Sequence, residues 1–199
     1  MAINLANNNS LANITALPSS VSGGAMTLLA TQTASGSANL SFTSGIDDTY
    51  DSYVFKFINI HPSTVAQLKC NFSVDGGSNY NVTKTTTSFV SQHAEDNSFA
   101  SVVYQAVRDL AQSTSDMWIS SSIKSDNDGN FSGQMSLYNP SSTVFVKHFI
   151  SRGNCMSSDP ASVDDYFAGY GNTTSAINAV IFRLNTGTFD GVIKLYGVS

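Results

Sequence analysis

Residues 67–74 read QLKCNFSV, and this short stretch decides the fold class. Every second residue is apolar: Leu68, Cys70, Phe72 and Val74. Side chains of a strand point to opposite faces in turn, so the pattern predicts a strand with one buried face and one wet face. DGG follows at residues 75–77, and these residue types tolerate the positive φ angles of a tight hairpin turn.

Outward from this strand, the chain reads as short apolar or alternating segments separated by turn residues. Three segments are apolar on both faces and are expected to be central strands: residues 53–60 (YVFKFINI), 143–150 (TVFVKHFI) and 176–184 (AINAVIFRL). Further strands are expected at residues 28–33, 38–43, 80–89, 117–123, 130–138 and 191–198. Residues 100–112 are the one helical candidate and could equally form a strand followed by a loop.

About ten short strands with almost no helix predict an all-β protein, an antiparallel, jelly-roll-like β-sandwich formed by residues 26–199. The side chains expected in its core are Phe55, Phe57, Phe72, Val146, Phe149, Ile181 and Phe182. At 199 residues the chain is long enough to bury such a core without a metal or a disulfide. We therefore expect no cofactor, and we expect Cys70 and Cys155 to remain unpaired thiols.

The charge composition narrows the classes of partner. Charged residues make up 12% of the chain, where about 25% is usual. The net charge is -5, and the nine Lys and Arg residues are scattered, whereas phosphate backbones are bound by clustered basic residues. Nucleic acid and anionic membrane surfaces are thus not expected partners. No apolar run of about 18 residues predicts a membrane span, and residues 1–9 lack the pattern of a secretion signal, so we expect synthesis in the cytoplasm.

Residues 1–25 differ from the rest, because they carry no charged side chain and no aromatic residue. They contain regularly placed aliphatic residues: Ile3, Leu5, Leu11, Ile14, Leu17 and Val21. Such a segment cannot build a core of its own. We expect an extended N-terminal arm whose aliphatic side chains contact a neighbouring subunit in a symmetric homo-oligomer, a trimer in the first instance. A loose terminus is the alternative.

A search for catalytic patterns finds no residue set that argues for an enzyme. The G-x-S-x-G elbow of serine hydrolases is absent, and His61, His93 and His148 are interpreted as a strand-end residue, a loop residue and a core or half-buried residue. Glycoside hydrolysis needs two carboxylates across the sugar, yet the chain has one glutamate, Glu95, and its aspartates lie mainly in turns. The expectation is that there are no catalytic residues.

Metal binding has one weak candidate. Residues 126–129 (DNDG) resemble the start of a calcium loop, but Leu137 stands where the closing acidic residue of an EF-hand loop would be. The Cys and His spacing of zinc sites is missing. A plain turn is therefore expected at residues 126–129, with no metal site.

Several segments resemble structural proteins of marine tailed bacteriophages, including phages of cyanobacteria. The resembling segments are residues 40–63, 75–89 (DGGSNYNVTKTTTSF), 108–115 (RDLAQSTS), 137–149 (LYNPSSTVFVKHF), 168–184 (AGYGNTTSAINAVIFRL) and 191–199 (GVIKLYGVS). Together they cover most of residues 26–199. The resemblance implies a virion component and assigns no catalytic residue. The intervening segments at residues 93–98 and 154–166 resemble the family least and are interpreted as loops where partner specificity could vary.

Three functions remain open at this point. The first is a tail-fibre or tail-appendage subunit with a structural or host-adhesion role, and the second is a capsid decoration protein. The third is a carbohydrate-binding or carbohydrate-cleaving module, whose partner would be a host surface glycan or receptor. This module would need an exposed aromatic pair beside carboxylates, for which Trp118 and the cluster Tyr166, Phe167 and Tyr170 after Asp164 and Asp165 are candidates. A buried strand rim is the other interpretation of that cluster.

Overall fold

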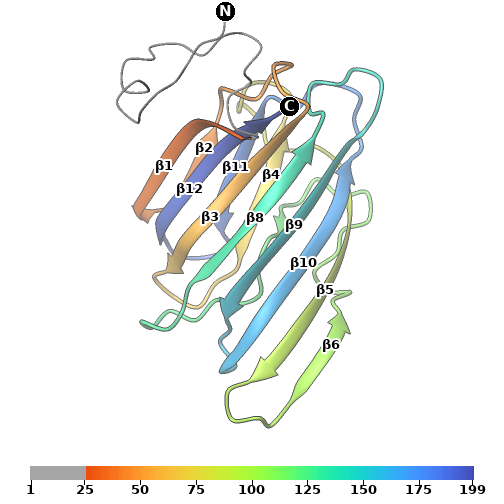
Figure 1. Ribbon diagram of the computed structural model, residues 1–199. Helices are drawn as coiled ribbons and strands as arrows, with labels where there is room; N and C mark the ends of the chain where they lie inside the picture. The colour runs from red at the N-terminus through yellow and green to blue at the C-terminus, as the bar shows by residue number, and fades with distance from the viewer. Residues whose placement is uncertain (1–25) are drawn as a thin grey trace, which may run out of the picture.

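A computed structural model describes residues 26–199 and confirms an antiparallel β-sandwich of two sheets (Figure 1). The eight-stranded sheet contains, in spatial order, β1 (Thr27–Ser37), β12 (Phe189–Val198), β3 (Ser52–Pro62), β8 (Phe131–Tyr138), β9 (Lys147–Met156), β10 (Ala161–Gly171), β5 (Lys84–Ala94) and β6 (Ala100–Tyr104). The four-stranded sheet contains β2 (Asn39–Phe42), β11 (Ala179–Leu184), β4 (Leu68–Ser73) and β7 (Met117–Trp118). The arm and its six aliphatic residues lie outside the described residues.

The core lies between the two sheets and is rich in phenylalanine. Phe182 of β11 packs edge-on against Phe55 and Phe57 of β3, with ring centroids 5.1 Å apart in both pairs. Phe72 of β4 meets Phe149 of β9 at 5.5 Å. Six of the seven expected core residues are buried; the seventh, Val146, is half-buried. The period-2 pattern in residues 67–74 therefore identified the inward face at Leu68, Cys70 and Phe72, but Val74 is exposed, and Asn71 and Ser73, expected on the wet face, are buried.

The segment at residues 143–150 is only partly a strand, contrary to the sequence prediction. Residues 143–146 form a loop in which Val144 and Phe145 are exposed, and β9 begins at Lys147. The apolar residues of this segment therefore lie in two environments, an exposed loop and the beginning of a strand. Lys147, although charged, is buried at the start of β9, and its Nζ donates to the Thr173 carbonyl oxygen at 3.1 Å.

Other boundaries also differ from the prediction. The segment at residues 154–166, expected to be a loop, belongs largely to β9 and β10, which pair without a register shift. Residues 100–112 form β6 and a turn, which is the second of the two options left open. The strand expected at residues 117–123 is reduced to β7, and the one expected at residues 80–89 begins at Lys84. Long-range strand pairing decided these boundaries.

The two sheets differ in extent, and this difference leaves one surface open. The four-stranded sheet lies behind the β12, β3 and β8 side of the larger sheet, whereas β5 and β6 extend past it (Figure 1). The face of the larger sheet that points away from the core has no layer over it in residues 26–199. It carries exposed apolar side chains, including Leu28, Phe89, Tyr104, Tyr138 and Ile150.

Candidate functional site

A row of aligned side chains crosses the open face of the eight-stranded sheet. Phe89 of β5, Tyr166 of β10 and Arg152 of β9 are directly opposite one another in the strand register. The rings of Phe89 and Tyr166 stack 4.5 Å apart with an interplanar angle of 7°, and the Arg152 guanidinium lies 4.7 Å from the Tyr166 ring centroid. Such cross-strand pairs stabilise a sheet, and cation–π contact adds to them.

Asp164 holds this row in place. Its Oδ2 accepts from Arg152 Nη2 at 2.7 Å and from the Tyr166 hydroxyl at 3.0 Å. Desolvation and the hydrogen bond to Asp164 raise the pKa of Tyr166, and the same carboxylate raises the pKa of Arg152. The ion pair is partly exposed, so it fixes geometry more than it contributes stability.

A shallow apolar hollow lies beside the row. It has a volume of about 130 Å³ and is lined by residues from three adjacent strands, among them Thr87, Phe89, Ile150, Tyr166 and Ala168. The small side chains of Thr87 and Ala168 are opposite one another in the register, which leaves space between the larger rings and Ile150. The hollow suits a small apolar or planar group on a partner, and Arg152 and Asp164 lie beside Tyr166, one of the residues that line it.

The aromatic residues singled out from sequence separate into different environments. Tyr166 is on the open face, whereas Phe167, next in the chain, is buried. Tyr170 is half-buried on the open face beside His148, with ring centroids 6.0 Å apart. Trp118 lies elsewhere, in β7, where Lys69 Nζ and Arg108 Cζ are 4.8 and 5.5 Å from its ring centroid. Of these four residues, Tyr166 alone therefore forms an aromatic pair beside a carboxylate.

Two members of the row, Phe89 and Arg152, were not identified from the sequence. Phe89 ends a segment of threonines and serines, and Arg152 follows the apolar strand start by several residues. Neither forms a recognisable motif with Tyr166. The one sequence signal that bears on them is the alternation of inward- and outward-pointing residues along a strand. To use that signal, the strand register must already be known.

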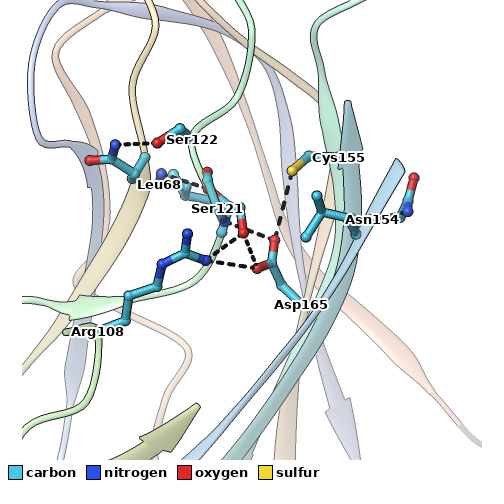
Figure 2. A network of polar contacts seen from close by, with 10 residues as sticks. Leu68, Arg108, Ser121, Ser122, Asn154, Cys155 and Asp165 are labelled. Atoms are coloured by element: carbon cyan, nitrogen blue, oxygen red, sulfur yellow. Dashed lines mark hydrogen bonds and ion pairs between the residues drawn. The ribbon is translucent and has the colours of Figure 1, made fainter. Parts of the chain in front are cut away.

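A second polar cluster is buried inside the sandwich (Figure 2). Asp165 points inward because its neighbour Asp164 points outward, and its side chain is fully buried. Its carboxylate accepts from the Ser121 amide at 2.8 Å and from the Ser121 hydroxyl at 2.6 Å. Arg108 Nη1 lies 3.6 Å away, and the Cys155 thiol contacts the same carboxylate at 3.7 Å.

Burial dominates the protonation of this cluster. It raises the pKa of Asp165 to about 6, and the hydrogen bonds from Ser121 and the charge of Arg108 oppose that rise only in part. Burial, followed by the neighbouring Asp165, also raises the pKa of the Cys155 thiol. A protonated, buried thiol is a poor nucleophile, and Asp165 has no exposed surface from which to act on a substrate. The cluster ties the segment around Ser121 to β10 and is structural in geometry.

The histidines do not join into an acid–base site. His148 is exposed on the open face, contrary to the predicted core or half-buried position, and His93 lies in β5 instead of a loop, where it contacts Asn97 at 3.2 Å. His61 lies near the end of β3, and its Nδ1 contacts the Gly129 carbonyl oxygen. Within residues 26–199, no histidine is hydrogen-bonded to a serine or a carboxylate.

The candidate calcium loop is a turn. The Gly129 amide donates to the Asp126 carbonyl oxygen at 2.8 Å, and the Asp126 carboxylate pairs with Lys124 at 2.7 Å. Over the part of the chain that the structure describes, no three His, Cys, Asp or Glu residues are grouped as metal ligands would be. Cys70 and Cys155 are both buried free thiols.

Comparisons with protein-family models, with curated proteins and with solved structures gave no match. The described residues contain no helix that is both long enough and apolar enough to cross a membrane.

Proposed function

We propose that this protein is a non-enzymatic subunit of the virion surface of a tailed bacteriophage, with a structural or host-adhesion role in a tail fibre or tail appendage. The observation that carries the proposal is the uncovered face of the eight-stranded sheet, where exposed aromatic and aliphatic side chains gather around the row of Phe89, Tyr166 and Arg152. Apolar surface of this kind marks contact with a partner. The resemblance to marine phage structural proteins supports the same role.

Labelling of intact particles tests the location. An antibody against the protein, imaged by electron microscopy with a gold conjugate, is expected to mark the tail. Label on the head would replace the tail assignment by capsid decoration, and particles without label would contradict the virion assignment.

Deleting residues 1–25 is expected to lower the oligomeric mass and to prevent incorporation, because the arm is the proposed subunit contact. An unchanged mass with normal incorporation would make the arm a loose terminus.

The stacked pair beside Asp164 favours a second candidate, the binding of a host surface glycan or receptor at the open face. Aromatic rings and an apolar hollow bounded by hydrogen-bonding groups are the usual make-up of a small-molecule site. Phe89 and Ile150 supply exposed apolar contact in the hollow, while Arg152 and Asp164 supply polar groups on the same face beside Tyr166.

Tyr166→Ala is expected to reduce binding of the purified protein to host cells at least tenfold, because it removes one wall of the hollow and the ring between Phe89 and Arg152. The measurement is retention of fluorescently labelled protein on intact host cells. Phe145→Ala, which truncates an aromatic residue in an exposed loop, is the matched control and should bind as the unmodified protein does. Equal retention of both variants would rule out adhesion through this face.

A further inference from the structure

The strand β6 forms one edge of the eight-stranded sheet (Figure 1). All five of its residues are exposed. Val102 is 72% exposed and Tyr104 is 55% exposed. Residues 98–107 read SFASVVYQAV and contain no charged side chain and no proline. A regular, apolar edge without charge is a template for pairing with another strand.

The backbone of β6 has unused hydrogen-bonding groups that point outward. On its inner side, the Ala94 amide donates to the Phe99 carbonyl oxygen, and the Gln105 amide donates to the Ser88 carbonyl oxygen, both at 2.9 Å. Hydrogen-bonded pairs alternate along an antiparallel ladder, so Ser101 and Val103 also face β5. The amide and carbonyl groups of Ala100, Val102 and Tyr104 therefore point away from the sheet.

The other sheet edges of the described chain are protected. β1 is interrupted by two register shifts, and Gly36 near its end has a φ of 56°. β2 is four residues long, and the Gln32 side-chain amide donates to its Ser41 carbonyl oxygen at 2.8 Å. β7 has two residues. Bulges, very short strands and covering contacts are the devices that prevent edge pairing. β6 is five residues long and pairs with β5 without a bulge.

We propose that β6 pairs antiparallel with the β6 of a second copy of this chain, across a two-fold axis at Val102. In this register Val102 is opposite Val102 of the second copy, and Tyr104 of each copy is opposite Ala100 of the other. A large side chain therefore meets a small one on each side of the two-fold axis. Ala100, Val102 and Tyr104, whose backbone groups point away from the sheet, then exchange backbone hydrogen bonds with the second copy. The two eight-stranded sheets become one continuous sheet with a closed, isologous contact.

The distribution of charge favours a second copy of the chain as the partner that pairs with β6. The chain carries a net charge of -5, so most surfaces of two copies repel each other, but residues 98–107 are neutral and bring no like charges together. The pairing goes beyond the proposed function and does not depend on it, because it requires only two copies of the sandwich. It is also separate from the contact proposed for residues 1–25.

The test measures the mass of the full chain in solution by light scattering after size-exclusion chromatography. Val102→Lys is expected to halve the mass, because it places two lysines opposite each other at the two-fold axis. Val144→Lys makes the same charge change at a residue that is 69% exposed in a loop, and its mass should stay at that of the unmodified protein. A Val102→Lys mass equal to that of Val144→Lys would overturn the proposal.

A mixture of two charged variants identifies which strand pairs with the edge strand β6. Val102→Glu alone is also expected to have half the mass, whereas an equimolar mixture of Val102→Lys and Val102→Glu should regain the full mass through opposite charges at the axis. If the edge instead accepts residues 1–25 of a neighbour, mixing restores nothing, and that result would overturn the two-fold pairing.

Cysteine cross-linking checks the register. Opposite residues of a hydrogen-bonded pair have Cα atoms about 5.5 Å apart, which lies within the range that a disulfide spans. Val102→Cys should form a covalent dimer on mild oxidation, and Val144→Cys should not. Both native cysteines are buried, so they do not compete for the cross-link. A Val102→Cys protein that stays monomeric on a reducing-agent-free gel would contradict the register.

Discussion

Phe72→Ala lowers the free energy of unfolding by about 3–5 kcal/mol, the range for removing a buried phenylalanine from a packed core. Phe72 is fully buried in β4, and its ring packs edge-on against Phe149 of the opposite sheet at 5.5 Å. The substitution removes a contact between the two sheets and leaves a cavity that their hydrogen-bonded strands cannot close. Urea denaturation followed by circular dichroism measures the loss.

Phe145→Ala is the matched control, because it removes the same side chain from an exposed loop position. Its effect should stay within about 0.5 kcal/mol, as is usual for surface substitutions. Equal midpoints for the two variants would mean that β4 does not present Phe72 to the core.

Asp165→Asn makes the protein progressively more stable, relative to the unmodified chain, as the pH rises from 4 to 8. Burial raises the folded-state pKa of Asp165 to about 6 from 3.8, so folding favours the protonated form. That contribution is complete below pH 4 and is lost as the pH rises through 6. The shift corresponds to about 3 kcal/mol at about 1.4 kcal/mol per pKa unit. Asparagine has no charge to bury and can still accept from the Ser121 amide.

The measurement is the difference between the unfolding free energies of the variant and the unmodified protein from pH 2 to pH 8. Contributions of other residues cancel in this difference. Asp75→Asn serves as a control of opposite sign. Hydrogen bonds from Ser73 and Asn79 lower the pKa of Asp75 to about 2, so the unmodified protein gains stability from Asp75 as the pH rises from 2 to 4. A flat difference curve for Asp165→Asn would mean that the buried carboxylate is not destabilised by burial.

The buried strand faces could be predicted from local patterns because burial follows side-chain alternation. In residues 67–74 the apolar residues Leu68, Cys70 and Phe72 are buried, as the period-2 pattern requires, whereas the fourth, Val74, lies beyond the end of β4 and is exposed. The last strand, expected at residues 191–198, is also present, although β12 begins earlier, at Phe189, and Asp190 and Gly191 lie within it at a register shift. The residue preferences of strands and turns are local, so they can be predicted from a single sequence.

The pattern was wrong where neighbouring strands changed the environment of a residue. Phe145 and His148 belong to one apolar-looking segment, yet both are exposed, because the sheet begins only at Lys147 and its outer face is uncovered. The segment at residues 154–166 was interpreted as a loop because it resembles the phage family least. β9 and β10 nevertheless extend through it, because each is paired on both sides and needs only one apolar face.

By itself, the sequence determined the all-β class, the inward faces of the main strands and the identity of most core phenylalanines, because each depends on residues that are close along the chain. The tertiary structure alone decided the open face and the free edge. Phe89, Tyr166 and Arg152 meet only because β5, β10 and β9 are neighbours in one register, and β6 has an unpaired backbone only because no strand follows it in the sheet. Register is set by contacts between segments distant in sequence, which local periodicity does not encode.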